Sequence, residues 1–459
     1  MKAIIPNIDA NSGKPYYLQL YQYIKKAIIK GEISADEKLP SLRLLSKTLQ
    51  LSVTTVEQAY SQLLVEGYIY SKPQSGYYAC YILSAPDTGT DQETVFYPAE
   101  ELLEQAPENQ YYDLNCFAFN KWKKCMNKVL TEYTPQLFFE SDPQGELALR
   151  TEIAKYLYLS RGVICQPDQI VIGAGTQQIT NQLANILKKM SINLVAVEDP
   201  GFMPVNNIFR DRGFAINPVS VGREGIDIEK LPSNIRSAVY VSPSNQVPTG
   251  AVMPAGRRYE LLEWAVKNDS IIIEDDYDSE LRYFGKPIPA LQGLDSAERV
   301  VYLGSFSATL FSSIKISYMV LPPGMAQIFQ SIRGDYTQTC SKTEQLTLAL
   351  FMEAGHYQTN IKKLRNLYAQ KLQLITRCLT TEHTKVTNTS SGLTIIVHAE
   401  SSKSAEELCR DAKAVGITAF PVSRTSENEI SSLILYYNQI PLEEIPDAIE
   451  KLLNKWYLK

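Results

Sequence analysis

Residues 270–280 read SIIIEDDYDSE: three consecutive isoleucines are followed at once by a run of acids around one tyrosine. A short, fully apolar run of this kind is typical of a strand that is buried on both faces, as in a parallel sheet covered by helices. Similar runs occur at 169–172, 194–197, 238–241 and 300–303, each separated from the next by helical stretches. Strands that alternate with helices predict an α/β domain with a mostly parallel sheet and helices on both faces.

Polar or small residues follow each predicted strand. After the first strand, Gly173–Gln178 (GAGTQQ) opens a helix expected over 179–189, and free backbone N–H groups at a helix N-terminus attract phosphate. The other strand ends are followed by Glu198–Phe202, Ser242–Gly250, Glu274–Glu280 and Gly304–Leu310. Singly, each is best explained as a solvated loop. Because ligands of such sheets bind beyond the carboxyl ends of the strands, the ordered series predicts a ligand site.

The first eighty residues predict a winged helix-turn-helix domain. Apolar spacing indicates a helix over 16–30, Ser41 is placed to cap a helix that ends at 49, and Ser52 is placed to cap another over 53–66. Two alternating segments within 67–79 then predict a hairpin wing. The alternative is a three-helix packing domain with a solvated face, but the ordered caps, turn and wing favour DNA binding. Its polar side carries Ser41, Arg43, Ser52, Thr54, Thr55 and Lys72.

Composition limits the other possibilities. The net charge is −5, but residues 1–80 carry nine Lys and Arg against six Asp and Glu, a balance of +3, which leaves −8 for the remainder. A weakly basic N-terminal segment of residues 1–80, called the head below, joined to an acidic remainder fits a small DNA-contacting module. Seven cysteines without CxxC spacing and three histidines argue against a metal site or disulfides. No signal peptide or membrane-spanning segment is predicted, so a cytoplasmic location is expected.

The head resembles the GntR-type winged helix. The likeness covers the sequence from Pro15 to Tyr78, including the LPS-x-R element at 39–43, Glu66-Gly67-Tyr68 and Gly76. It implies contact with double-stranded DNA through Ser41, Arg43, Ser52, Thr54, Thr55 and Gly76. The recognition helix lacks the arginine that is usual at its start, so hydroxyl groups and methyl contacts with thymine are expected to read the bases.

The strand-end motifs resemble those of fold-type I aminotransferases, which use pyridoxal 5′-phosphate, and with the head they resemble the MocR/GabR family of regulators over nearly the whole chain. The resemblance implies that Asp275 faces the pyridine nitrogen and that Tyr277, with Asn245 or Gln246, lies near the phenolic oxygen. Phe202 would stack on the ring. The full expected cofactor set is Gly175, Thr176, Gln177, Phe202, Asn245, Gln246, Asp275, Tyr277, Ser305, Ser307, Ala308 and Lys315.

Two departures from the family pattern change the expected function. Ala308 stands where the family has the lysine that forms a Schiff base, so the cofactor is expected to bind non-covalently, no catalytic residue is expected, and the chain is not expected to be an enzyme. This is either a natural loss or a substitution, and the intact motifs around it favour substitution. In addition, Leu433–Tyr437 (LILYY) lacks the arginine that clamps a substrate carboxylate, and Ile434 at that place is expected to lie in a buried strand.

The resemblance therefore predicts a transcription regulator with three parts: the DNA-binding domain at 1–80, a linker at 81–110 and an aminotransferase-like domain at 111–459 that also forms a homodimer. Pyridoxal phosphate is expected to be its effector or cofactor, as in the vitamin B6-responsive branch often called PdxR. Two alternatives are a regulator that responds to an amino acid through an aldimine, and a true aminotransferase. A third is a regulator that has lost its ligand.

Overall fold

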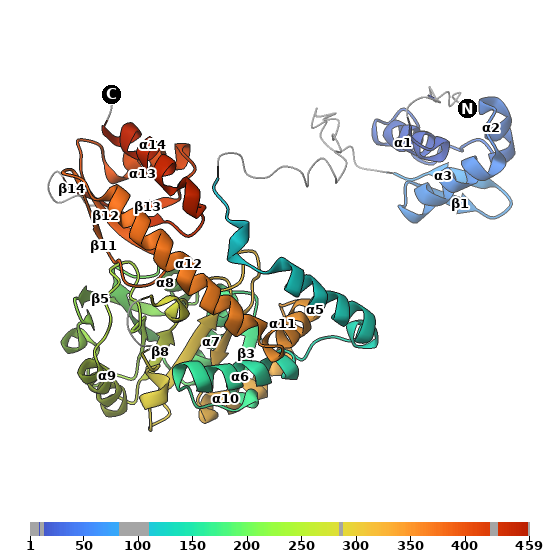
Figure 1. Cartoon of the computed structure of the whole chain (residues 1–459). Coiled ribbons are helices and arrows are strands. Elements are labelled where there is room, and N and C mark those ends of the chain that lie inside the picture. Colours follow the sequence, from blue (N-terminus) through green and yellow to red (C-terminus); the bar gives the residue numbers. More distant parts are fainter. Residues whose placement is uncertain (1–8, 10–12, 82–109, 284–287, 423–429, 458–459) are drawn as a thin grey trace. The chain divides into compact units, whose positions relative to one another are not determined.

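The computed structural model describes residues 9, 13–81, 110–283, 288–422 and 430–457 (Figure 1). The chain divides into two compact units, residues 1–104 and 105–459. Residues 82–109 of the expected linker lie outside the described residues, so the boundaries at 80 and 111 stay predictions. No helix in the described parts of the chain is long and apolar enough to cross a membrane.

The N-terminal unit consists of three helices and a hairpin, as predicted. These elements are α1 Tyr16–Ile29, α2 Leu42–Leu49, α3 Val53–Val65, β1 Ile69–Lys72 and β2 Gly76–Ala79. The hydroxyl oxygens of Ser41 and Ser52 accept hydrogen bonds from the backbone N–H groups of Leu44 and Thr55 at 3.3 and 3.0 Å. Both helices therefore begin at the predicted caps. The apolar faces close over a core that includes Leu20, Ile24, Val56, Leu63 and Ile69.

The large unit is built on an eight-stranded sheet with the order β3-β10-β9-β8-β7-β4-β5-β6. Its strands are β3 Ile170–Gly173, β4 Leu194–Asp199, β5 Ala215–Gly222, β6 Gly225–Ile226, β7 Ala238–Val241, β8 Ile271–Asp275, β9 Val300–Ser305 and β10 Ser317–Val320. Strands β9, β8, β7, β4 and β5 pair in parallel. β10 lies antiparallel between β3 and β9, so β3 and β9 run in the same direction. The predicted mostly parallel sheet is confirmed.

Helices cover both faces of this sheet (Figure 1). They are α5 Phe119–Glu132, α6 Leu147–Arg161, α7 Thr176–Lys189, α8 Met203–Asp211, α9 Ala255–Lys267, α10 Pro323–Ile332 and α11 Lys342–Glu353. In β8, Ile271 and Ile273 pack in the core formed with α7, α8 and α10, whereas Ile272 packs in the core formed with α9. The isoleucine run is fully apolar because each face of its strand is buried.

The C-terminal part forms a second, antiparallel sheet with the order β11-β12-β14-β13, which the sequence patterns did not predict. Its elements are α12 His356–Leu379, β11 Thr384–Thr387, β12 Thr394–Glu400, α13 Ala405–Ala414, β13 Ala419–Pro421, β14 Ile430–Tyr436 and α14 Ile445–Tyr457. The strand expected around Ile434 is present as β14, but the expectation that it is buried holds only for alternate residues, and Ile434 itself is half-buried. Leu433 and Leu435 face the core, and strand alternation turns Ile434 to the half-exposed face.

A buried ion pair joins the start of the large unit to α12. The Lys371 ammonium lies 2.7 Å from Asp113 Oδ2, and the two side chains are 0% and 3% exposed. Lys371 also donates a hydrogen bond to the carbonyl of Asn438, just beyond β14, at 2.8 Å. One side chain therefore connects the segment that enters the large unit to the C-terminal sheet.

We expect Lys371→Met to lower the free energy of unfolding by about 3–5 kcal/mol, because it leaves the Asp113 carboxylate buried without its partner. Urea denaturation followed by tryptophan fluorescence measures the loss. The matched control is Lys451→Met, which breaks the exposed Lys451–Asp447 pair (2.6 Å) and should leave the free energy of unfolding close to that of the native chain, because solvent screens an exposed pair. Equal losses in the two variants would show that the Asp113–Lys371 pair has no special role.

Candidate functional site

The carboxyl ends of β3, β4, β7, β8 and β9 lie at one edge of the large sheet, because these strands run in the same direction. The first residue of β10, which runs the opposite way, lies at this edge too. Every cofactor residue predicted from the sequence is in a loop, a strand end or the first turn of a helix at this edge. The topology therefore brings together residues that are separated by up to 140 positions, from Gly175 to Lys315.

The turn after β3 presents free backbone donors. Gly175 precedes α7 with a φ of 85°, a conformation that glycine adopts readily. Helix α7 therefore begins at Thr176, earlier than the predicted start at Ile179. Within the described residues, no group accepts a hydrogen bond from the backbone N–H of Thr176 or of the exposed Gln177. Two unpaired N–H groups at the positive end of a helix fit an anion such as a phosphate.

Asp275 ends β8 and is buried at the same edge. The hydroxyl of Tyr240 on the neighbouring β7 donates a hydrogen bond to its Oδ2. The other oxygen, Oδ1, makes no hydrogen bond with the described part of the chain. Burial raises the pKa of Asp275 to about 7; the Tyr240 hydrogen bond opposes the shift and the nearby Asp276 charge adds to it. Such a half-satisfied carboxyl group suits a partner that brings a proton or a positive charge.

Asn245 and Tyr277 lie together beside Asp275. The Asn245 amide nitrogen is 3.3 Å from the Tyr277 hydroxyl and 2.9 Å from Asp278 Oδ2. Gln246 points elsewhere, since its amide donates to the carbonyls of Pro200 and Val247 and accepts from Thr249. Of the two amides expected near Tyr277, the structure therefore brings Asn245 to it, whereas Gln246 joins its own loop to the loop after β4.

The turn after β9 is closed by hydroxyl groups. Ser305 Oγ accepts a hydrogen bond from Ser317 Oγ at 3.0 Å and a longer one from the Ser307 backbone N–H at 3.4 Å. Ser307 Oγ donates to the carbonyl of Ile314 at 2.8 Å. Ser307 therefore serves the turn itself, while the Ser305 hydroxyl, which already accepts two hydrogen bonds, keeps its own O–H free to donate at the sheet edge.

Three further predicted residues surround this edge. Ala308 is half-buried and packs against the core of the C-terminal sheet. Lys315 is exposed just before β10, and no acid in the described chain pairs with it. Phe202 is the N-cap of α8, after β4, and its side chain is 38% exposed. A free cation and an uncovered ring thus lie in loops at the same edge of the sheet as the free N–H groups, and position 308 carries no side-chain amine.

Sequence reasoning missed four residues of this site. Arg161, on α6, is buried; its Nε lies 2.7 Å from Asp276 Oδ2 and it donates to Ser244 Oγ at 2.8 Å. Tyr240 and Asp278 hold Asp275 and Asn245, and Ser391 donates to Asn245 Oδ1 at 3.3 Å. The lone tyrosine in the apolar run AVYV could have indicated Tyr240. Arg161 and Ser391 have no local signal, because their partners are far away in the sequence.

The predicted DNA-contacting residues occupy the surface of the head. Arg43, Ser41, Ser52, Thr54 and Lys72 are exposed, and Thr55 is half-buried because its hydroxyl lies 2.7 Å from that of Ser52. The Lys72 ammonium lies over the ring of Tyr78 at 4.5 Å, within the hairpin. Gly76 has a φ of 114°, which explains the glycine in the tight hairpin turn.

Comparisons with known families match both units. Residues 107–428 match the family model for aminotransferase class I and II, and residues 16–78 match that for bacterial regulatory proteins of the gntR family. The fold and these two matches define the class: a DNA-binding transcription regulator that carries a fold-type I aminotransferase-like domain.

Relatives that match most of the chain identify its family more narrowly than the two family models do. The uncharacterized HTH-type transcriptional regulator YdeL of Bacillus subtilis is 38% identical over 99% of both chains. The probable rhizopine catabolism regulatory protein MocR of Rhizobium meliloti is 30% identical over 91% of this chain and 88% of its own. PdxR of Corynebacterium glutamicum, a pyridoxine biosynthesis transcriptional regulator, is 31% identical over 78% of this chain and 77% of its own. The protein belongs to the MocR-type regulators of the GntR family.

Solved structures show the same fold for the large unit. Pyrococcus horikoshii kynurenine aminotransferase, solved in complex with PMP, has a TM-score of 0.65 at 23% identity and covers 79% of this chain and 95% of its own. LysN, the α-aminoadipate aminotransferase of Thermus thermophilus, has a TM-score of 0.65 at 23% identity over 78% and 93%. The aminotransferase-like fold expected from the sequence is confirmed.

We expect Asp275→Asn to raise the melting temperature of the free protein at pH 8 by a few degrees. The raised pKa means that the Asp275 carboxyl destabilises the fold as the pH rises from about 3.8 to about 7, and this cost is complete at pH 8. Asparagine can still accept the Tyr240 hydrogen bond without carrying a charge. Calorimetric scans at pH 5 and pH 8 should show a larger gain at pH 8.

The control for this variant is Asp269→Asn, which changes a carboxylate that is 58% exposed and should show no such gain. If Asp275→Asn lowered the melting temperature equally at pH 5 and pH 8, the Asp275 charge would not destabilise the ligand-free protein.

Proposed function

We propose that the large unit binds pyridoxal 5′-phosphate without a covalent bond and that this ligand controls DNA binding by the head. One observation carries the proposal: the unpaired N–H groups of Thr176 and Gln177 and the unpaired Oδ1 of Asp275 lie at the same edge of one sheet. They match the two ends of the ligand, which are a phosphate and a ring nitrogen that carries a proton.

The remaining residues fit the same ligand. Ser305 and the Lys315 ammonium would complete the phosphate site, with Lys315 acting as a point charge. Asn245 and Tyr277 would face the phenolic oxygen, and the exposed Phe202 ring would cover the pyridine. When bound, pyridoxal phosphate supplies an electron sink and an aldehyde. The methyl group of Ala308 cannot condense with that aldehyde, so we propose that the chain binds the vitamer but does not catalyse lysine-dependent transamination.

The effector is proposed to be the vitamer itself, in the control of vitamin B6 metabolism. β14, Ile430–Tyr436, contains no arginine, so the strand offers no guanidinium to the carboxylate of an amino acid. The relative PdxR, which is named for pyridoxine biosynthesis, supports this direction. In a homodimer, ligand binding would change DNA affinity only if the ligand prefers one arrangement of the two heads.

Titration with pyridoxal phosphate should quench the intrinsic fluorescence saturably, without an imine absorbance band. Asp275→Asn should weaken this binding about tenfold or more, since it removes a charge-assisted hydrogen bond, while Asp269→Asn should leave it unchanged. Ala308→Lys should create the imine band if the aldehyde lies beside position 308. The proposal fails if neither the native chain nor Ala308→Lys takes up the vitamer.

On the DNA side, Arg43→Ala should weaken binding to an operator fragment by about 1–3 kcal/mol, because we propose that its exposed guanidinium, in the first turn of α2, contacts a phosphate or a base edge. Gel shifts with fragments from the protein's own promoter region, with and without pyridoxal phosphate, measure the loss. Arg410→Ala removes the same charge from α13, outside the head, and should bind as the native chain does. Equal affinity of Arg43→Ala and native protein would exclude Arg43 from the DNA interface.

A further inference from the structure

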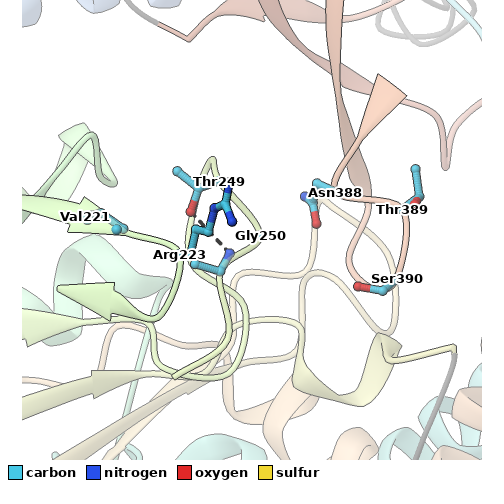
Figure 2. A pocket seen from close by; sticks show the side chains of 9 residues that line it. Val221, Arg223, Thr249, Gly250, Asn388, Thr389 and Ser390 are labelled. Atoms are coloured by element: carbon cyan, nitrogen blue, oxygen red, sulfur yellow. Dashed lines mark hydrogen bonds between the residues drawn. The ribbon is translucent and has the colours of Figure 1, made fainter. Parts of the chain in front are cut away.

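A cavity of about 560 Å³ lies in the large unit, apart from the proposed cofactor set. It is lined by Val221, Gly222, Arg223, Thr249, Gly250, Ala251, Asn388, Thr389 and Ser390. Figure 2 shows Arg223, Thr249 and Gly250 on one side and Asn388, Thr389 and Ser390 on the other. The first side comes from the turn between β5 and β6 and the loop after β7, and the second side from the segment between β11 and β12.

Arg223 supplies the only positive side chain of this lining. Its guanidinium is exposed and forms no ion pair or hydrogen bond with the described residues. The nearby Arg257 differs in having partners: it donates to the carbonyl of Ile226 in β6 at 2.9 Å and lies 3.3 Å from Glu260. A planar, permanently charged group with several unused donors at a cavity wall fits a carboxylate, which it can bind in a bidentate manner.

The opposite wall offers groups of complementary chemistry. The hydroxyls of Thr389 and Ser390 make no hydrogen bond with the described chain, and both can donate or accept. Asn388 has a φ of 58° and donates to the carbonyl of Thr394 at 3.3 Å, but its Oδ1 is buried without a partner. An unpaired buried acceptor is unfavourable. A donor on a ligand would satisfy this oxygen if the Asn388 side chain turned toward the cavity and gave up its long hydrogen bond to Thr394.

Tight packing holds Asn388 beside the first wall. A Cβ added at Gly250, which has a φ of 70°, would lie 2.0 Å from Asn388 Oδ1. The glycine therefore allows the two loops to approach closely, and the polar groups of both loops face one cavity.

We propose that this cavity binds a small carboxylate that also carries a hydrogen-bond donor, such as an amino acid or a hydroxy acid. Arg223 would hold the carboxylate, and Asn388, Thr389 and Ser390 would meet the amino or hydroxyl group. A single guanidinium balances one negative charge, which favours a carboxylate over a phosphate dianion.

The same segment connects this cavity to the proposed cofactor site. Ser391 donates to Asn245 Oδ1 at 3.3 Å, and a Cβ on Gly392 would lie 2.7 Å from Asn245 Nδ2. Residues 388–390 thus line the cavity while their immediate neighbours pack on Asn245, so a ligand in the cavity would contact the segment that supports Asn245. The carboxylate site does not depend on whether pyridoxal phosphate binds.

Calorimetric titration of the full chain without pyridoxal phosphate tests the proposal, with L-alanine, L-glutamate, L-lactate, L-malate and inorganic phosphate as probes. At least one of the four carboxylates should bind saturably, and Arg223→Gln should weaken that binding about tenfold or more, as expected for a charge-assisted hydrogen bond. Arg223→Lys keeps the charge but loses the planar fork, so its loss should be intermediate. Arg410→Gln on α13 is the matched control and should bind like the native chain.

Three results would overturn the carboxylate site: no carboxylate binds the native chain, Arg223→Gln binds the best probe as tightly as the native chain, or phosphate binds as well as that probe. Arg223 is exposed and unpaired, so the melting temperature of Arg223→Gln should equal that of the native protein, and a binding loss then reports on the site. Because the vitamer is absent, this result stands apart from the outcome for pyridoxal phosphate.

Discussion

The buried carboxyl of Asp275, which accepts one hydrogen bond from Tyr240 and has one oxygen unused, is the constraint on which the large unit depends. A mostly parallel sheet covered on both faces places this group at the carboxyl end of a strand that begins with three buried isoleucines. Water cannot fully solvate it there. The pKa of the Asp275 carboxyl is therefore raised, and its unused oxygen can pair with a group that brings a proton or a positive charge. The surrounding strand ends supply the other donors because they share its direction.

The groups proposed to hold the ligand are distinct from the amine that covalent catalysis would need. The N–H groups of Thr176 and Gln177, the Asp275 carboxyl and the Asn245–Tyr277 pair are all in place, while position 308 holds a methyl group. An enzyme needs the amine, because covalent attachment is part of its reaction cycle. A regulator needs only a ligand that binds one conformation better than another. The chain keeps the ligand-facing groups without the amine, which is consistent with the requirement of a regulator, and it belongs to a family of transcription regulators.

Prediction from the sequence succeeded where the structure of a segment depends on residues close to it in the chain. The isoleucine run of β8, the serine caps of α2 and α3 and the glycine turn before α7 each follow from local burial, capping or backbone rules. It failed for β5, which contains Pro218 and is partly exposed, and for the C-terminal sheet, where only the strand around Ile434 was expected and where β12 and β14 mix half-exposed and polar residues with buried ones. Ile434 shows the reason: an apolar residue in a strand does not reveal which face it occupies until the neighbouring strands are known.

By itself, the sequence determined the class of fold, the DNA-binding head, the loops that form the candidate site and the absence of an amine at position 308. Only the tertiary structure decided that Asn245 and not Gln246 meets Tyr277, that Tyr240 holds Asp275, and that Arg223 shares a cavity with Asn388. The physical reason is sequence distance. Caps and strand patterns depend on residues within a few positions, whereas hydrogen-bond partners, burial and pKa depend on which segments the packed core brings together.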